Sequence, residues 1–350
     1  MGDVLHALPA VTSLRAALPD SWIGWAIEPQ WEPLLCANPA AVRGPQMPVV
    51  DRIHSIPAKR WAGNLFSLAT LRQVRAVRRE LRTQRYDLCI DLQGAVRSAW
   101  IGWMTATPRL VGEANPREPL ARWFFDQRVH TAGVHVIEQA NEVVAAALEN
   151  FKTGPLPDFS AALPIDPEAE RWFDSWLAER NVGRFVLMNP GAGWGAKRWP
   201  AERYAAVAQE LHRAGYASIV NVGPGESQLA KTIRGDGNGA IFALSGSIGQ
   251  LVACTRRASL FIGGDTGPLH LAAALRIPVV GIYGPTDPAR NGPYGTNARV
   301  LRHVDSKRDH TRRSEPEAGL LTITPRDVLD AVQDILHLRS SPISETAEPR

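Results

Sequence analysis

A glycine-rich turn in the second half of the chain carries the residue types best suited to hold an anion. The segment 263–268, Gly-Gly-Asp-Thr-Gly-Pro, follows a short apolar run and precedes a helical pattern. Free N–H groups and the positive end of a helix dipole favour negative charge at such a turn, and glycine lets the backbone approach a ligand. Thr266 offers a hydroxyl for a phosphate oxygen, and His270 lies three residues after Gly267. Taken alone, the pattern fits equally well a tight turn in which Asp265 caps the helix.

A second glycine-rich loop, residues 189–200, also follows an apolar run and precedes a helix. Its Lys197 and Arg198 carry positive charge that can offset a diphosphate, although a basic pair in a loop is more often simply solvated. Two such loops in one half of the chain favour a shared anionic ligand. A third turn, 223–226, ends in Glu226. This residue is suited either to accept hydrogen bonds from ribose hydroxyls or to occupy the first turn of a helix.

Short apolar runs alternate with helical patterns in both halves of the sequence, which predicts parallel α/β sheets. Strands are expected at residues 22–27, 87–92, 185–188, 218–222, 241–244, 260–262 and 279–283. Helix start signals are Pro200 before 202–213, the capping-box pair Ser247 and Gln250, and the pair Thr324 and Asp327 before 325–338. Two doubly wound domains facing a cleft would bind ligands at the carboxyl ends of their strands.

Length and composition set the outer limits of these expectations. The 350 residues, 45% of them hydrophobic, suit two domains of ordinary size. We expect an N-terminal domain over 1–155, a proline-rich linker over 156–170, a C-terminal domain over 171–338 and a disordered tail over 339–350. The three scattered cysteines predict neither a disulfide framework nor a zinc site, and no apolar run reaches the length of a membrane span. We also expect no signal peptide, and the net charge of +4 permits an acidic partner without requiring one.

One predicted helix in the first half is strongly basic. Leu71, Val74, Val77 and Leu81 have helical spacing, and they are surrounded by Arg72, Arg75, Arg78, Arg79, Arg82 and Arg85. Such a helix can lie near anionic lipid headgroups or acidic sugars, or it can be an ordinary solvated helix face. A second basic stretch, 302–313, is expected to be a loop near the cleft.

Taken together, these segments resemble the lipopolysaccharide heptosyltransferase family (glycosyltransferase family 9), with most likeness to the heptosyltransferase I type. The matching segments are 1–10 (MGDVLHALPA), 91–94 (DLQG), 189–194 (NPGAGW), 197–200 (KRWP), 264–270 (GDTGPLH), 284–288 (GPTDP) and 291–295 (NGPYG). The likeness extends from residue 1 to about residue 338.

The resemblance implies a GT-B glycosyltransferase fold of two Rossmann-like domains. It further implies an inverting, metal-independent transfer of heptose from ADP-heptose to the Kdo-lipid A inner core of lipopolysaccharide, with no cofactor. Asp3 is then the base, because an attacking hydroxyl must lose its proton, and Lys197 stabilises the departing diphosphate. The other donor-binding residues are expected to be Gly193, Glu226, Gly264, Asp265, Thr266, Gly267 and His270. The acceptor-binding residues are expected to be His6, Gln93 and Arg97. Without the family pattern, Asp3 would more often be an ordinary helix cap.

The resemblance also sets an expectation about surroundings. We expect a monomer without nucleic-acid partners, cytoplasmic and peripheral on the cytoplasmic face of the inner membrane, where its acceptor is a lipid.

One departure from the family pattern concerns the start of the chain. Family members carry an apolar strand before the Gly-Asp-Val turn, whereas this sequence begins on the turn itself at Met1. We therefore expect the first strand of the N-terminal sheet to be absent and Asp3 to be less firmly held. The corresponding hypothesis is that the true start lies upstream of Met1.

Two other functions remain compatible with the sequence. The first is a nucleotide-sugar epimerase on the same two-domain fold, for which no convincing acid/base set can be named. The second is a non-catalytic nucleotide-binding or glycan-binding protein, which gains weight if Asp3 is poorly fixed.

Overall fold

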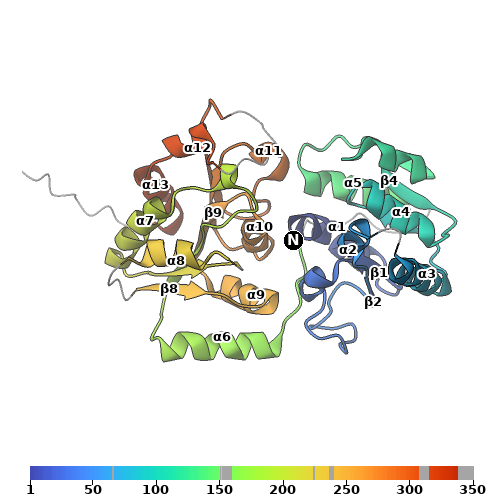
Figure 1. The fold of residues 1–350 in the computed structure, drawn as a ribbon, viewed down its shortest axis with the longest axis horizontal. Helices are drawn as coiled ribbons and strands as arrows, with labels where there is room; N and C mark the ends of the chain where they lie inside the picture. The colour runs from blue at the N-terminus through green and yellow to red at the C-terminus, as the bar shows by residue number, and fades with distance from the viewer. Residues whose placement is uncertain are drawn as a thin grey trace, which may run out of the picture. The chain divides into compact units, whose positions relative to one another are not determined.

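The chain forms two compact units, which Figure 1 shows as a ribbon. Unit 1 comprises Met1–Trp176, Gly246–Arg256 and Ala289–Gly295, and unit 2 comprises Leu177–Ser245, Arg257–Pro288 and Thr296–Arg350. The computed structural model describes residues 1–64, 67–149, 151, 160–223, 225–235, 240–306 and 315–337. The expected tail 339–350 lies outside the described residues, as do 156–159 of the expected linker and 307–313 of the second basic stretch.

Unit 1 contains two separate parallel sheets rather than one. The first pairs β1 (Gly24–Ile27) with β2 (Arg52–Ser55), and the second has the order β3 (Cys89–Asp91), β4 (Leu110–Glu113), β5 (Gln127–Val129). No described strand joins β1 to β3, and Ala26 in β1 is exposed. The described chain enters α1 (Gly2–Ala17) directly, without a strand before it.

Helices cover these two sheets. α1 packs against α5 (Val136–Leu148) through Ala10, Ala140 and Val144. The other helical elements of unit 1 include η1 (Pro29–Leu34), α2 (Ala58–Ala62), α3 (Leu68–Thr83), α4 (Val96–Met104), η2 (Pro119–Phe124) and α11 (Pro288–Asn291). The first residue of α11, Pro288, is the last residue of a unit 2 segment. α6 (Pro167–Glu179) and α9 (Ile248–Arg257) also extend past the boundaries of unit 1.

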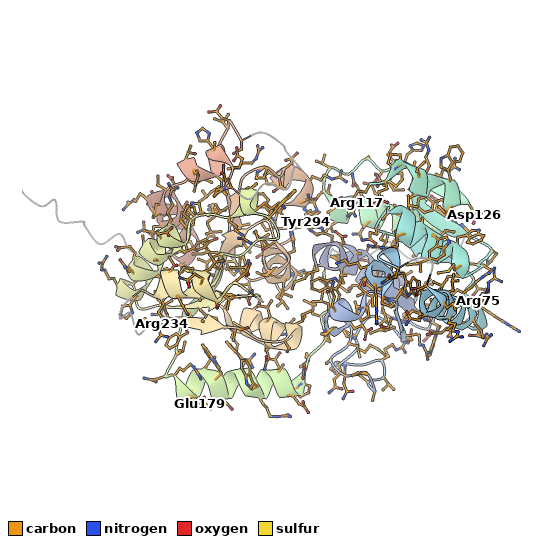
Figure 2. All side chains as sticks on the ribbon, viewed as in Figure 1. Arg75, Arg117, Asp126, Glu179, Arg234 and Tyr294 are labelled. Carbon is orange, nitrogen blue, oxygen red and sulfur yellow. The ribbon has the colours of Figure 1, made fainter. Side chains whose placement is uncertain are left out.

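α3 is the basic helix expected from the sequence. Its partly buried Val74 and Val77 and its buried Leu81 pack against the buried cluster of Ile56 and Trp61. These three residues of the apolar stripe therefore belong to the core of unit 1, whereas Leu71 at the start of the stripe is 42% exposed. The arginines of α3 are exposed, and Arg75 is labelled on this helix in Figure 2.

Unit 2 is a doubly wound parallel sheet, as the alternation of strands and helices predicts. The strand order is β11 (Ala298–Arg302), β10 (Val279–Tyr283), β9 (Leu260–Gly264), β6 (Phe185–Asn189), β7 (Ala217–Asn221), β8 (Ile241–Leu244). β6, β9 and β10 are buried along their whole length, as expected of a parallel sheet with helices on both faces. The helical elements are η3 (Gly195–Lys197), α7 (Ala201–Arg213), α8 (Ser227–Arg234), α10 (Gly267–Ala274), α12 (Ala318–Thr322) and α13 (Pro325–Leu336).

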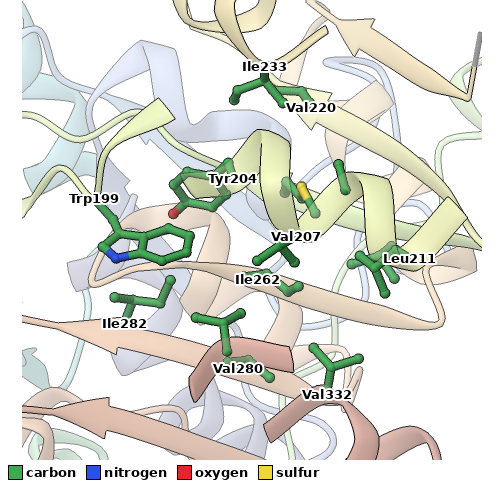
Figure 3. Close-up of a cluster of buried hydrophobic side chains, with 14 of the residues drawn as sticks. Trp199, Tyr204, Val207, Leu211, Val220, Ile233, Ile262, Val280, Ile282 and Val332 are labelled. Carbon is green, nitrogen blue, oxygen red and sulfur yellow. The ribbon is translucent and has the colours of Figure 1, made fainter. Parts of the chain in front are cut away.

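One apolar core fixes the sheet of unit 2 against α7, α8 and α13. Figure 3 shows Trp199 and Tyr204 packed beside Ile282, with Val207 over Ile262. The strand order reverses between β6 and β9, which are neighbours in the sheet. Loops leaving such a reversal point at the carboxyl ends of the strands diverge and leave room for a ligand. The two glycine-rich loops of the sequence leave from these two strands.

Most local predictions about helix starts are confirmed. Ser247 and Gln250 form a reciprocal capping box, with Ser247 N donating to Gln250 Oε1 at 2.8 Å and Gln250 N donating to Ser247 Oγ at 3.2 Å. Thr324 and Asp327 do the same at α13. Pro200 also marks a helix start, although it does not take the first helical position that its fixed φ suits: its extended backbone (ψ 137°) makes it the N-cap, and α7 begins at Ala201. Among the described residues, no helix is long and apolar enough to cross a membrane.

Candidate active site

In unit 2, the two glycine-rich loops meet through a compact charged cluster. Lys197 Nζ lies 2.6 Å from Asp265 Oδ2, and His270 Nε2 lies 3.0 Å from Asp265 Oδ1. The Asp265 side chain is only 8% exposed, and Lys197 Nζ also lies 5.2 Å from the centre of the Trp194 ring. The sequence predicted that these three residues share a ligand, and the structure brings them into direct contact.

The charge of Asp265 is held by its two partners. Burial alone would raise the pKa of Asp265, but the hydrogen bond and charge of His270, together with Lys197, outweigh it and hold the pKa well below its ordinary value. Asp265 therefore stays ionised and fixes both neighbouring side chains. The alternative interpretation of Asp265 as a helix cap is wrong, because Thr266 occupies the N-cap of α10.

Close backbone approach brings the two loops together at Gly264. A Cβ on this residue would lie 3.1 Å from the backbone oxygen of Lys197, so a larger residue would push the loops apart. The Thr266 hydroxyl donates to Gly264 O at 3.2 Å and accepts from Asn189 Nδ2 at 3.3 Å. A ligand phosphate would therefore compete with Gly264 O for this hydroxyl hydrogen.

Asn189, the last residue of β6, connects the same loops through hydrogen bonds of its side chain. Its Nδ2 donates to Gly191 O at 2.8 Å as well as to Thr266 Oγ1, and its Oδ1 accepts from Asn221 Nδ2 at 2.7 Å. Its backbone oxygen accepts from Tyr204 OH at 3.3 Å. One buried amide thus ties together the carboxyl ends of β7, β6 and β9. The sequence analysis missed Asn189 and Asn221; the available signal was a polar residue ending each of two neighbouring buried strands.

Glu226 and Gly193 occupy different positions around the loop after β6. Glu226 Oε2 accepts from Gly223 N at 2.9 Å, and a Cβ on Gly191 would collide with the same oxygen. Glu226 therefore packs directly over Gly191, with its carboxylate at the turn that the sequence indicated. A Cβ on Gly193 would meet nothing within 4 Å, so this glycine borders open space.

In unit 1, Asp3 is placed at the first turn of α1 with its side chain 56% exposed. Its Oδ2 accepts from Gln93 Nε2 at 3.0 Å and from Arg117 NH1 at 3.4 Å. Burial lowers the pKa of the neighbouring Met1 α-amino group to about 6, against the opposing effect of the Asp3 charge. The family resemblance implied Asp3 as the base and Gln93 as an acceptor-binding residue, but it did not predict their contact. It gave no role to Arg117, which is labelled in Figure 2.

A buried carboxylate shapes the turn that carries Gln93. Asp91 Oδ1 accepts from Gln93 N at 2.8 Å and from Gly94 N at 3.0 Å, and Oδ2 accepts from Ser98 Oγ at 2.9 Å. Burial raises the pKa of Asp91, and these hydrogen bonds act in the opposite direction. The turn is thereby fixed with the Gln93 side chain directed at Asp3.

Gly94 explains how Arg117 reaches the same carboxylate. Its φ of +64° lies in the left-handed region that favours glycine, and a Cβ there would lie 3.0 Å from Arg117 N. Glu118 N also donates to Gly94 O at 2.9 Å. The backbone of residues 116–118 therefore packs directly on Gly94, which places Arg117 beside Asp3.

The two remaining expected acceptor residues lie apart from this contact. His6 is on α1, one turn after Asp3, and its ring meets the His135 ring edge-on at 6.0 Å. Arg97 is a half-buried residue in the first turn of α4.

The fold and the loops define a class of protein. Two parallel α/β units, one with paired glycine-rich loops and a lysine at its strand-order reversal, form the Rossmann-like pair of a GT-B glycosyltransferase. The Escherichia coli heptosyltransferase WaaC, solved with ADP, has this architecture: it matches with a TM-score of 0.76 at 26% identity, over 95% of this chain and 96% of WaaC.

The sequence comparisons are more specific. The profile of glycosyltransferase family 9 (heptosyltransferase) matches residues 74–320, and the chain belongs to this family. Lipopolysaccharide heptosyltransferase 1 of Pseudomonas aeruginosa is 28% identical over 301 residues, covering 84% of this chain and 79% of the relative. Lipopolysaccharide heptosyltransferase 1 of Escherichia coli K12 is 28% identical over 356 residues, covering 96% and 97%. The chain is therefore a glycosyltransferase enzyme, as its motifs predicted.

Proposed function

We propose that this enzyme transfers a heptose from ADP-heptose to the Kdo-lipid A inner core of lipopolysaccharide, with inversion at the anomeric carbon. The observation that carries the proposal is the Lys197–Asp265–His270 cluster, in which two glycine-rich loops present a fixed cation at the carboxyl edge of a doubly wound sheet. Support for the substrates comes from the names of the relatives and from the solved WaaC complex with ADP-2-deoxy-2-fluoro heptose, which matches at 26% identity.

The donor half of the chemistry belongs to unit 2. The Lys197 ammonium has three N–H donors, and its contacts with Asp265 O and Oδ2 occupy two of them. The third donor and the Gly267 N–H at the start of α10 are oriented to serve the diphosphate, where they stabilise negative charge as the sugar–phosphate bond breaks. Pro268 has no N–H, and the Leu269 and His270 N–H groups donate to Thr266 O. The third Lys197 donor and the Gly267 N–H offset the leaving-group charge without a metal ion.

The acceptor half belongs to unit 1. The Asp3 carboxylate accepts the proton of the attacking acceptor hydroxyl, whose oxygen forms the new bond to the anomeric carbon while ADP departs with the old bonding pair. Gln93 and Arg117 hold the same oxygen of Asp3, which leaves Oδ1 for the incoming proton. Because a catalytic base must be fixed to be effective, these two residues are the positioning partners of Asp3.

The Asp3→Asn variant tests the assignment of the base. We expect kcat to fall about a hundredfold or more, because the amide cannot take the proton, while the ADP-heptose KM stays near its original value. Steady-state kinetics and calorimetric titration of ADP measure both quantities. Asp20→Asn, an exposed aspartate just after α1, is the matched control and should leave kcat unchanged. A kcat for Asp3→Asn within threefold of the parent removes Asp3 from the mechanism.

The epimerase alternative has a structural observation behind it. UDP-GlcNAc 2-epimerase of Methanocaldococcus jannaschii matches with a TM-score of 0.52 at 11% identity, which shows a shared fold alone. Incubation of ADP-heptose with the enzyme in the absence of acceptor separates the two reactions. Recovery of unchanged sugar supports transfer, and appearance of an epimer supports the alternative.

The place of action follows from the proposed substrates. A nucleotide sugar is water-soluble and Kdo-lipid A is a lipid, so we propose that the enzyme works at the cytoplasmic face of the inner membrane. Support for this placement is the dense positive charge of α3, since anionic headgroups attract arginines close to the bilayer surface.

A further inference from the structure

Exposed apolar side chains occur on two neighbouring helical elements of unit 1, η2 and α4. Leu120 and Trp123 on η2 are each 66% exposed, and Trp103 on α4 is 54% exposed. Contiguous exposed apolar groups are uncommon on proteins that remain free in water, and they mark interaction surfaces. In the apolar stripe of α3, by contrast, the two valines and Leu81 pack on the core, and only Leu71 of the stripe is exposed, at 42%.

The three side chains share a location because η2 packs on α4. Val96 and Ala99 of α4 pack with Ala121 and Phe125. Trp103 follows Ala99 by four residues and Val96 by seven, so it continues the same row of α4 toward the end of the helix.

Arginines surround this apolar group. The guanidinium groups of Arg122 and Arg128 lie 5.3 Å and 5.6 Å from the centre of the Trp123 ring, and Arg128 Nε donates to Arg122 O at 3.0 Å. A tryptophan flanked by cations is suited to the boundary between headgroups and acyl chains, where the ring is half-buried and the charges meet phosphates. The two nearby carboxylates, Glu118 and Asp126, accept from backbone N–H groups of Val96 and Leu110.

The basic face of α3 adjoins the same area. Arg82 Nε donates to Met104 O at 3.3 Å, so the end of α3 reaches the residue after Trp103. Residues 68–85, which include α3, carry six arginines and one carboxylate. The combined surface therefore offers apolar anchors beside a strong positive field, which complements an anionic bilayer.

We propose that Trp103, Leu120 and Trp123, with Arg122 and Arg128, form a membrane anchor that inserts into the headgroup region of an anionic bilayer. The proposal rests on the proposed function in one respect: η2 begins two residues after Arg117, so the anchor is continuous in sequence with the residue that holds the proposed base Asp3. An enzyme docked through this anchor receives a lipid-borne acceptor beside Asp3.

Vesicle flotation without any substrate tests the anchor independently of turnover. The full chain is mixed with vesicles of phosphatidylcholine alone, or of three parts phosphatidylcholine to one part phosphatidylglycerol. We expect binding to the anionic vesicles only, weakened by high salt, and reduced about tenfold in the Leu120→Ala, Trp123→Ala double variant. Trp22→Ala removes another exposed tryptophan of unit 1 and is the matched control. Circular dichroism confirms that each variant is folded.

Kinetics separate the anchor from the transfer reaction. With an acceptor freed of its acyl chains, the double variant should keep the parent kcat and KM, while the KM for vesicle-borne acceptor rises. Equal vesicle binding by parent and double variant overturns the proposal, as does equal loss in Trp22→Ala or binding to neutral vesicles. If no acceptor is turned over by the parent, the proposed function fails, yet the flotation result still decides whether the anchor exists.

Discussion

At the scale of single residues, the site of unit 2 depends on one buried carboxylate. Asp265 contacts the ammonium of Lys197 and the ring of His270, and without it two polar side chains would lose their shared partner. Breaking a buried ion pair by removing one member is costly because the other charge is left uncompensated. Asp265 therefore contributes to folding as well as to the placement of the proposed leaving-group cation.

The Asp265→Asn variant tests this account through pH dependence. The pKa of Asp265 is lower in the folded state than its ordinary value, so its contribution to stability is complete above about pH 4 and is lost as the pH falls further. We expect the variant to be about 3 kcal/mol less stable than the parent at pH 7, with the gap narrowing in acid. Urea unfolding at a series of pH values measures the gap.

The control for this comparison is an exposed ion pair. Glu179→Gln removes one partner of Arg180 at the end of α6, where both side chains are exposed, and it should leave the unfolding free energy almost unchanged. If the difference in unfolding free energy between Asp265→Asn and the parent stayed constant down to pH 2, the charge of the Asp265 carboxylate would not contribute to stability.

At the scale of elements, the loops after β6, β7 and β9 act as one cradle because Asn189 joins them. The Asn189→Asp change keeps the shape of the side chain but replaces the donor to Gly191 O and Thr266 Oγ1 with an oxygen. We expect ADP affinity to fall about tenfold, since a lost buried hydrogen bond costs about 1–3 kcal/mol and the new charge repels the diphosphate. Isothermal titration with ADP measures the change.

A buried amide elsewhere in the fold controls for stability alone. Asn141 Nδ2 donates to Ile137 O within α5, and Asn141→Asp makes the same chemical change in unit 1. It should lower the unfolding free energy while leaving ADP affinity intact. Equal losses of ADP affinity in both variants would mean that Asn189 has only a general structural role.

The turn at Gly94 is the corresponding element on the acceptor side. Gly94→Ala forces a Cβ into a left-handed conformation and against Arg117 N, so we expect a loss of about 1–3 kcal/mol in unfolding free energy together with a lower kcat. Gly63→Ala is the control, because Gly63 has a φ of −79° and its Cβ would meet no atom closer than 3.7 Å. Unchanged stability and turnover in Gly94→Ala would disconnect this turn from Asp3.

At the scale of the whole molecule, the sequence predicted best what depends on local pattern and burial. β6, β9 and β10 were found because fully buried parallel strands appear as continuous apolar runs. β2, β4, β5 and β11 were missed, since strands such as Gln127–Val129 are three to five residues long and carry polar side chains. Their position is set by pairing with a neighbouring strand, which no local pattern reveals.

In the candidate site, too, local contacts could be predicted from the sequence and contacts between distant segments could not. The contact between Asp265 and His270 is local, and both residues belong to one loop and helix. The contact between Asp3 and Arg117 spans 114 residues and exists because Gly94 admits the intervening backbone. The sequence shows that residue 94 is a glycine, but only the fold shows that the backbone packed on Gly94 places Arg117 beside the Asp3 carboxylate.

The central claim is heptose transfer to a lipid acceptor, and mass spectrometry of the acceptor tests it most directly. The full chain is incubated with ADP-heptose and Kdo-lipid A in the presence of EDTA, and acceptor and ADP are followed together. The account predicts an acceptor heavier by one heptose, one ADP released for each acceptor converted, and rates unaffected by EDTA. An acceptor of unchanged mass, with ADP-heptose left intact or merely hydrolysed, would contradict it.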